Sequence, residues 1–163
     1  MEDPRIIKMT EKKLIGIRMR TSLSENKTGI LWHNFMKKRK EVLNRVDQDL
    51  YSVQIFDEGL TMESFTPDTL FEKWAAVEVS RFENIPDGMR SLKIPDGLYA
   101  VFEHKGETGI FHGTLQYIFS RWIPDSTYQV DHRPHFEIMG ANYLGPENPE
   151  SVEEVWIPIK DKN

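Results

Sequence analysis

Cysteine is absent from the 163-residue sequence, which excludes disulfide bonds, thiolate metal sites and cysteine nucleophiles. The chain also lacks an apolar run long enough to span a bilayer. Its opening residues, Met-Glu-Asp-Pro, have neither the basic segment nor the apolar segment of a signal peptide. These absences predict a cytoplasmic protein without a membrane partner.

Positive charge is scarce. The 21 Lys and Arg residues are outnumbered by 26 Asp and Glu residues, which gives a net charge of −5. Because phosphate binding needs a clustered excess of cations, this balance argues against direct contact with nucleic acid. The one basic run, KKRK at residues 37–40, lies inside a helical pattern with acidic residues around it, which is typical of a solvated helix face.

Metal-binding motifs are also missing. The five histidines show no HExxH or similar spacing. His132 and His135 are close together, but a zinc site built on them would need two further ligands that the pattern does not supply. We therefore expect neither a metal nor a cofactor.

What the chain does contain is the composition of one globular domain, with 39% hydrophobic and 29% charged residues. We expect a single domain over residues 1–163, made of two similar halves at about 5–82 and 89–160. Short apolar strands with a small central residue recur at 14–18 and 98–102, and the tripeptide Thr-Gly-Ile recurs at 28–30 and 108–110. This pattern predicts a two-fold duplication with a period of about 80 residues.

Each Thr-Gly-Ile tripeptide opens a helical pattern, with Thr28 and Thr108 as the expected N-caps. The first helix is predicted over residues 28–46, and its apolar face consists of Trp32, Phe35, Met36, Leu43 and Val46. The second has an equivalent face formed by Phe111, Leu115, Ile118, Phe119 and Trp122. Pro124 should end this second helix, because its ring cannot continue the hydrogen-bond ladder.

Two strands follow each helix. Alternation of apolar and polar residues predicts strands at 50–56 and 73–81 in the first half, and at 135–139 and 154–159 in the second. The turn IPDG at 94–97 lies near the junction of the halves. We therefore predict an α+β fold of pseudo-two-fold duplicated β-α-β-β units, in which an antiparallel sheet carries helices on one face and a ligand cleft on the other.

The strand at 135–139 carries a lone carboxylate. Alternation puts Phe136 and Ile138 on the core side, and Glu137 on the other side with Met139. A carboxylate enclosed among apolar groups must have either a raised pKa or a cationic partner. The same alternation adds further side chains to the face that the helices leave uncovered: Gln54, Phe56, Trp74, Glu78, Phe102 and Trp156.

Such a face predicts a groove for planar and cationic organic molecules. Aromatic rings attract cations, and a partly desolvated carboxylate supplies the counter-charge. The hydroxyl of Tyr99 could reach this cleft or bond locally. The residues expected to bind the ligand are therefore Glu137, Trp74, Trp156, Met139, Phe102, Phe56, Glu78 and Tyr99.

Five segments also carry a resemblance to a known family. They are WAAVEV at 74–79, IPDGLYAVF at 94–102 with HKG at 104–106, FSRWIP at 119–124, PHFE at 134–137 and EEVWIPI at 153–159. In order and spacing the chain resembles a stand-alone GyrI-like domain. This small-molecule-binding fold is also the effector-binding part of AraC-type and MerR-type transcription regulators such as Rob and BmrR.

The resemblance implies a duplicated SHS2-like fold and a central acidic residue in the ligand cleft, which corresponds to Glu137. The family often has an aromatic residue shortly after this position, where this chain has Ile138, Met139 and Gly140. The first predicted strand begins within the opening twenty residues, so we expect no helix-turn-helix and no direct DNA binding. The implied function is a small-molecule-binding protein for amphipathic aromatic, cationic ligands.

Two alternatives stay open. Some GyrI-like proteins resemble hydrolases of strained-ring alkylating natural products, and Glu137 could then serve as the general base. Other members resemble inhibitors of DNA gyrase, which would make gyrase or a regulator the protein partner. Haem binding is not expected, because no histidine occupies a convincing position for an axial ligand.

Overall fold

The computed structural model describes residues 3–162. The elements of the first half are β1 (Arg5–Met9), β2 (Lys12–Thr21), α1 (Thr28–Lys38), the 3-10 turn η1 (Arg39–Glu41), β3 (Leu50–Ile55) and β4 (Phe71–Val79). The second half contains β5 (Arg90–Ile94), β6 (Gly97–Lys105), the 3-10 turn η2 (Thr108–Ile110), α2 (Phe111–Tyr117), the π-helix η3 (Ile118–Trp122), α3 (Ile123–Asp125), β7 (Tyr128–Val130), β8 (His135–Met139) and β9 (Val152–Asp161).

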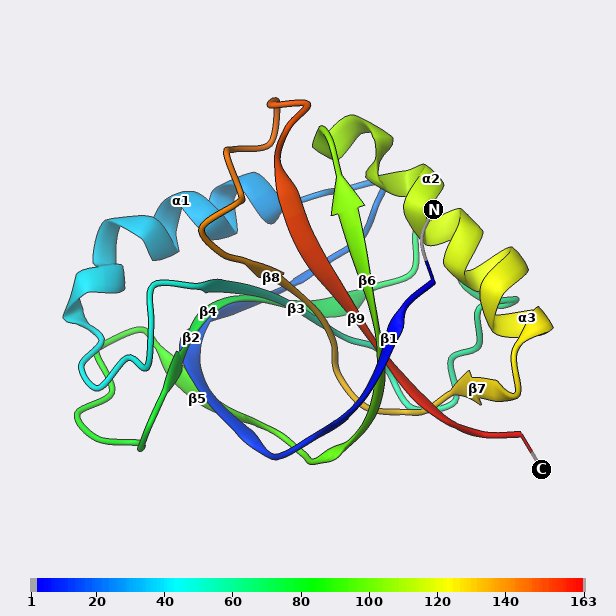
Figure 1. The fold of residues 1–163 in the computed structure, drawn as a ribbon. Helices are drawn as coiled ribbons and strands as arrows, with labels where there is room; N and C mark the ends of the chain where they lie inside the picture. The colour runs from blue at the N-terminus through cyan, green and yellow to red at the C-terminus, as the bar shows by residue number, and fades with distance from the viewer. Residues whose placement is uncertain (1–2, 163) are drawn as a thin grey trace.

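The strand order of the sheet reflects the duplication. Its strands lie in the order β1-β6-β9-β8-β3-β4-β2-β5, and all pairs are antiparallel. The unit β2-α1-β3-β4 therefore matches β6-α2-β8-β9, and the central pair β3 and β8 forms the seam between the two halves (Figure 1). This arrangement confirms the α+β class and the duplicated β-α-β-β organisation.

Both helices cover the same face of the sheet (Figure 1). Leu31 and Phe35 of α1 are fully buried against the face of β2 and β4 that carries Ala75. Ile118 of η3 packs on the face of β6 and β9 that carries Val155. The strand registers place Ala75 and Val155 on one face of the sheet, because paired residues of antiparallel strands point to the same side.

The opposite face is also filled. Trp74, Tyr99, Phe136 and Trp156 are buried there in one cluster, at 0–8% exposure. The sheet curls around this cluster because two short links, residues 10–11 and 95–96, join strands from opposite ends of the sheet. This corrects the expectation that the helix-free face holds an open cleft, since Trp74, Tyr99 and Trp156, which were assigned to that cleft, form a core instead.

The helix ends differ from the sequence-based expectation. Helix α1 ends at Lys38, and the following chain becomes extended early enough for Arg45 to form a β-bridge with Val79. Thr28 is the first residue of α1 rather than its cap, and its amide donates to Asn26 Oδ1. Thr108 begins η2 and makes no side-chain cap.

The second helical segment extends one residue past Pro124, which was expected to end it. Its last helical residue is Asp125, immediately after the proline at 124. Within residues 3–162, no helix combines the length and the apolar character needed to cross a membrane.

Close approach of β2 and β4 explains the small residue at the centre of the first strand pattern. A Cβ added at Gly16 would lie 2.1 Å from the carbonyl oxygen of Ala75 and 2.7 Å from Cα of Ala76. Both are backbone atoms in the middle of the sheet, so they cannot move aside without breaking the ladder.

We expect Gly16→Ala to lower the free energy of unfolding by about 2 kcal/mol or more, because it overpacks a rigid strand pair. The matched control is Gly29→Ala in α1, where an added Cβ has no heavy atom within 4 Å. That substitution should be neutral or stabilising by up to about 1 kcal/mol. Urea unfolding measures both, and equal midpoints for the two variants would contradict the close-approach explanation.

Candidate functional site

The buried carboxyl of Glu137 lies at the seam between the two halves. Glu137 is 7% exposed and stands opposite Ser52 of β3 and Val155 of β9. Its side chain therefore points to the helix-bearing face, between the strands that support α1 and those that support α2. Gln54 Nε2 donates to Glu137 Oε1 at 3.0 Å.

Local sequence explains how this polar group enters the interior. Pro134 precedes the strand, and its carbonyl accepts a hydrogen bond from Tyr99 Oη at 2.9 Å. Phe136 and Ile138 point into the core on the opposite face, which fixes Glu137 between them on the helix side. A shift of register by one residue would exchange these faces, so apolar burial on one side holds the carboxyl in place on the other.

Two further charged groups face the same region. Lys73 of β4 is the ladder partner of Gln54, and Glu153 of β9 lies two residues before Val155 on the same strand face. Both side chains are half-buried. Lys73 and Glu153 thus flank the buried Glu137 in a charge cluster contributed by both halves of the fold.

Burial raises the pKa of Glu137, and this rise is only partly offset by the charge of Lys73 and by the polar side chains of Gln54 and Ser52. Burial and the negative charge of Glu137 raise the pKa of Glu153 to about 7. Burial lowers the pKa of Lys73, although both carboxylates act in the opposite sense. In all three groups, desolvation opposes the charged form.

Aromatic side chains continue the site along β8 on the helix-bearing face. His135 lies two residues before Glu137 and is 6% exposed, and burial lowers its pKa to about 3. The ring of Phe56 meets the imidazole edge-on, with the ring centres 5.0 Å apart. Phe119 of η3 lies 6.1 Å from the same imidazole. His135 is therefore a neutral ring within an aromatic group.

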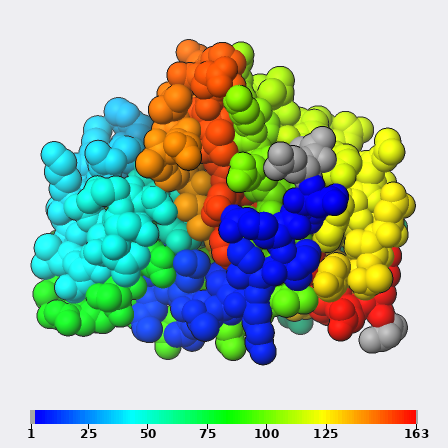
Figure 2. Space-filling model, viewed as in Figure 1, coloured from blue at the N-terminus to red at the C-terminus, as the bar shows by residue number. Residues whose placement is uncertain are grey.

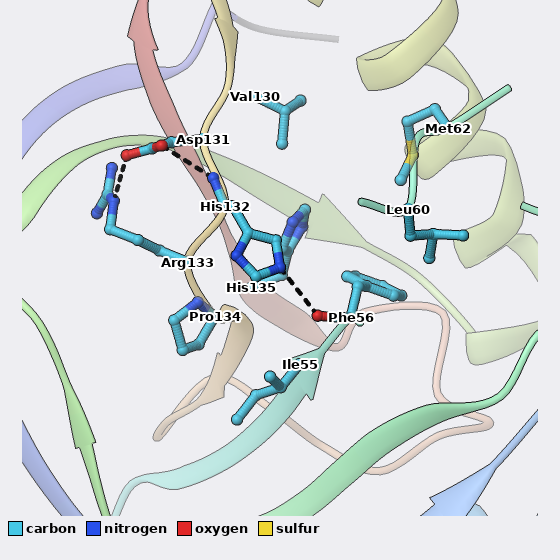
Figure 3. Close-up of a pocket in the computed structure, with 10 residues that line it drawn as sticks. All are labelled: Ile55, Phe56, Leu60, Met62, Val130, Asp131, His132, Arg133, Pro134 and His135. Carbon is cyan, nitrogen blue, oxygen red and sulfur yellow. Dashed lines mark hydrogen bonds and ion pairs between the residues drawn. The ribbon is translucent and has the colours of Figure 1, made fainter. Parts of the chain in front are cut away.

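A cavity of about 170 Å³ adjoins His135 (Figure 3). Its walls come from the end of β3, the following loop, and the segment between β7 and β8. The lining residues are Ile55, Phe56, Leu60, Met62, Val130, Asp131, His132, Arg133, Pro134 and His135. The cavity lies at the His135 end of β8.

The loop of residues 140–151 borders the other end of β8. Figure 2 shows this segment rising as a ridge with the neighbouring ends of β6 and β9. The loop is fastened to the chain before α2, because the amides of Gly106 and Thr108 donate to the carbonyls of Ser151 and Pro146, each at 2.8 Å. Glu153 follows this loop directly.

The structure divides the predicted site residues between the two faces of the sheet. Glu137, Met139, Phe102 and Phe56 lie on the helix-bearing face, which corrects their expected position on the uncovered face. Phe102 is covered by Trp122, with the ring centres 5.2 Å apart. Glu137 and Met139 therefore share the helix-bearing face of β8, and Phe56 lies against His135 near the start of the same strand.

The remaining four residues of the predicted set belong to the opposite face. Trp74, Trp156 and Tyr99 are core residues there. Glu78 shares their face but forms an ion pair with Lys12 at 3.2 Å and accepts a hydrogen bond from the hydroxyl of Tyr51. These four side chains do not converge with Glu137, because successive strand residues point to opposite sides.

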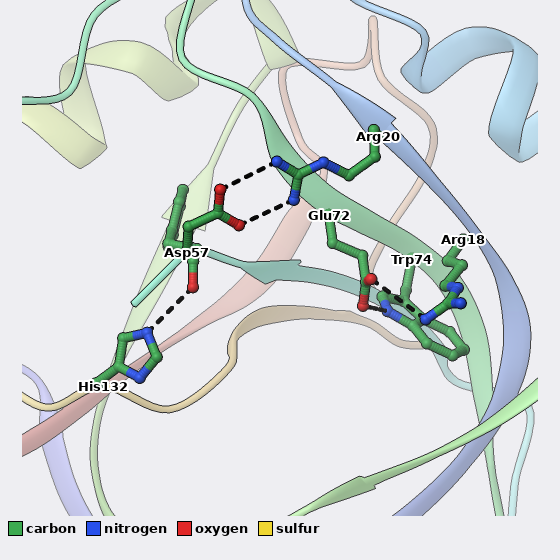
Figure 4. Close-up of polar contacts among 7 residues, drawn as sticks. Arg18, Arg20, Asp57, Glu72, Trp74 and His132 are labelled. Carbon is green, nitrogen blue, oxygen red and sulfur yellow. Dashed lines mark hydrogen bonds and ion pairs between the residues drawn. The ribbon is translucent and has the colours of Figure 1, made fainter. Parts of the chain in front are cut away.

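The two tryptophans have matching roles in the two halves. Trp74 Nε1 donates to Glu72 at 2.7 Å, and Glu72 also binds Arg18 of β2 (Figure 4). Trp156 Nε1 donates to Glu154 at 3.1 Å in the same relative position on β9. Each indole N–H is thus satisfied within its own strand, which explains how these rings enter the core without losing a hydrogen bond.

Sequence reasoning did not single out Lys73, Glu153 or His135 as site residues. A usable signal was present for His135, which alternates with the apolar Phe136 and Ile138 in the predicted strand 135–139, whereas Lys73 begins its predicted strand and Glu153 precedes the predicted strand 154–159. Among residues 3–162, no group of three or more histidine, aspartate or glutamate side chains is arranged to hold a metal ion.

The chain is similar to one part of two longer proteins. The chain is 25% identical over 155 residues to the transcriptional regulator BrlR of Pseudomonas aeruginosa, covering 95% of this chain and 54% of BrlR. The chain therefore spans about half the length of this curated relative. The structure of EcmrR in complex with DNA has the same fold over 97% of this chain and 57% of EcmrR, with a TM-score of 0.71 and 12% identity.

Proteins of similar length share the fold as well. An integron cassette protein of Vibrio cholerae matches with a TM-score of 0.70 and 15% identity, over 98% of this chain and 97% of its own. SAV2435, solved with bound tetraphenylphosphonium, matches with a TM-score of 0.71 and 14% identity, over 98% of this chain and 94% of its own.

The sequence model of the GyrI-like small molecule binding domain matches residues 2–160. This match covers nearly the whole chain, and it agrees with the duplicated fold and with the relatives among transcription regulators. The chain belongs to the GyrI-like family of small-molecule-binding domains.

Proposed function

We propose that the protein binds amphipathic aromatic cations between α1 and α2, with the positive centre of the ligand close to Glu137. The observation that carries this proposal is the burial of the Glu137 carboxyl, which is 7% exposed and receives its side-chain hydrogen bond from a neutral amide. A buried carboxylate without full compensation gains from the approach of a cation. The aromatic rings of Phe56 and Phe119 nearby suit a ligand with a flat apolar part.

The charge cluster supports a ligand with a single positive charge. When all three groups are ionised, Glu137 and Glu153 carry two negative charges and Lys73 carries one positive charge. The difference is one negative charge, which a monocation would neutralise. Tetraphenylphosphonium, bound in SAV2435, has this charge and four aromatic rings, and it is therefore a suitable probe for this chain.

Glu137→Gln tests the role of the carboxyl. We expect the variant to bind tetraphenylphosphonium at least tenfold more weakly, because the amide has nearly the same shape but no charge. Isothermal titration calorimetry measures the affinity. Glu103→Gln, at an exposed position of β6, is the matched control and should bind as the wild type does.

Unchanged affinity in Glu137→Gln would contradict the proposal. The hydrolase alternative uses the same carboxyl, since burial raises its pKa and makes it a stronger base. Turnover of a cyclopropane-bearing alkylator by the wild type, and its loss in Glu137→Gln, would assign catalysis to the site in addition to binding.

Lys73 competes with the ligand for the two carboxylates in this proposal. Lys73→Met keeps an unbranched apolar stem and removes the positive charge, so the variant should bind tetraphenylphosphonium about tenfold more tightly at pH 8. Lys105→Met, at an exposed position, is the control for the loss of one positive charge from the whole protein. Weaker binding by Lys73→Met than by this control would mean that Lys73 assists the ligand.

The pKa of Glu153 predicts a pH dependence of stability. Between about pH 4.5 and pH 7 the folded protein keeps a proton on Glu153 that the unfolded chain has lost, so the free energy of unfolding falls as pH rises. Glu153→Gln removes this contribution. The stability of the variant relative to wild type should therefore increase across this window by on the order of 1–2 kcal/mol, after allowance for partial solvent screening.

Urea unfolding at several pH values measures this difference. His135 acts in the opposite direction, because its pKa of about 3 lies below that of the unfolded chain and stability is lost as pH falls through this range. Its contribution is common to both proteins and cancels in the difference. A difference that stays constant from pH 4.5 to pH 7 would contradict the raised pKa of Glu153.

A further inference from the structure

We propose that the cavity beside His135 is a separate subsite that takes one aromatic ring of the ligand whose cationic centre lies at Glu137. The inference rests on the proposed function, and it adds the shape of the ligand to it. The cavity adjoins the same strand that carries the carboxyl, at the His135 end.

The size of the cavity fits a single ring. Its volume is about 170 Å³. An apolar protein cavity of about 150 Å³ is known to stay dry and to bind benzene. A phenyl group therefore fits, whereas a fused polycyclic system would need the walls to move apart.

The chemistry of the walls favours an aromatic group. Ile55, Leu60, Met62 and Val130 supply apolar side chains from three separate segments, as Figure 3 shows. His135 remains neutral because its burial lowers its pKa to about 3. Aliphatic carbons, a thioether and neutral aromatic rings are the contacts that a phenyl group prefers.

The charged residues at the rim are paired with each other rather than free for a ligand. Asp131 accepts a hydrogen bond from Arg133 Nε at 2.8 Å, and Arg133 Nη2 donates to the carbonyls of Leu98 and Ile159. The guanidinium lies over the ring of Tyr99, and its Nη1 is buried without a hydrogen-bond partner among residues 3–162. Figure 3 shows this pair on the side of the cavity away from Leu60 and Met62. The interior of the cavity therefore has little net charge.

The outer wall is fixed on two sides. Arg20 forms two hydrogen bonds with Asp57, at 3.0 and 3.1 Å, which tie the start of the loop after β3 to β2 (Figure 4). His132 Nε2 lies 3.1 Å from the carbonyl oxygen of Phe56 on the other side. This preformed wall lowers the entropic cost of ordering the site around a ring.

The spacing along β8 sets the length of the ligand. Glu137 and His135 are two residues apart on one strand face, which separates their side chains by about 7 Å. With its ring centre level with His135 and its positive centre level with Glu137 along the strand, a ligand that uses both sites carries the two about 7 Å apart. A phenyl group joined to a trimethylammonium group by three methylenes comes close to this separation.

A series of ω-phenylalkyl-trimethylammonium ions with one to five methylenes tests this geometry by isothermal titration calorimetry. We expect the highest affinity at three methylenes, and binding about tenfold tighter than that of propyl-trimethylammonium, because one ring is buried. Leu60→Trp, which fills the cavity, should reduce the phenylpropyl ion to the affinity of the propyl ion. Leu70→Trp, on the exposed part of the same loop, should leave both affinities unchanged.

The outcomes separate the two proposals. If Glu137→Gln weakens every member of the series but phenylpropyl and propyl ions bind wild type equally, the ring subsite is overturned and the proposed function stands. If Glu137→Gln changes no affinity, the proposed function fails. Met62→Trp is a second filling variant, used if thermal unfolding shows that Leu60→Trp does not fold, and full retention of phenylpropyl binding by the folded variant also overturns the subsite.

Discussion

The structure is organised around a carboxyl group that is buried where two copies of one structural unit meet. Glu137 lies on the central strand pair, so the apolar side chains of both halves exclude water from it. A group in this position loses hydration that a single amide hydrogen bond from Gln54 does not replace. The ionised form of Glu137 is therefore poorly stabilised at the centre of the fold. Lys73 on β4 lowers the pKa of Glu137, and the charge of Glu137 raises the pKa of Glu153 on β9.

Duplication and the curvature of the sheet together explain why the buried carboxyl lies on the helix-bearing face. The sheet curls until Trp74, Tyr99 and Trp156 fill its concave face, which leaves no space there for a ligand. On the convex face each helix covers the strands of its own half, so the seam lies between the two covered regions. The two-fold arrangement thus leaves the central strands β3 and β8 between the two covered regions, where we propose that Glu137 meets the ligand.

Much of this could be predicted from the sequence, because alternation and repeats are local signals. The repeated Thr-Gly-Ile tripeptides and the similar strands at 14–18 and 98–102 predict the duplication, and alternation separates Glu137 from Phe136. The side of the sheet could not be predicted, since alternation distinguishes two faces without stating which one the helices cover. Lys73 was missed for a related reason, because its proximity to Glu137 depends on strand pairing between distant segments.

In the proposed complex, a bound cation stabilises the ionised forms of Glu137 and Glu153. A cation lowers the pKa of a neighbouring carboxyl, so binding should release protons wherever the raised pKa leaves the free protein protonated. Calorimetric titration with tetraphenylphosphonium at pH 6, repeated in buffers of different ionisation enthalpy, counts these protons. We expect net proton release that disappears above about pH 8, whereas binding without proton release at pH 6 would contradict a cation site at these carboxyl groups.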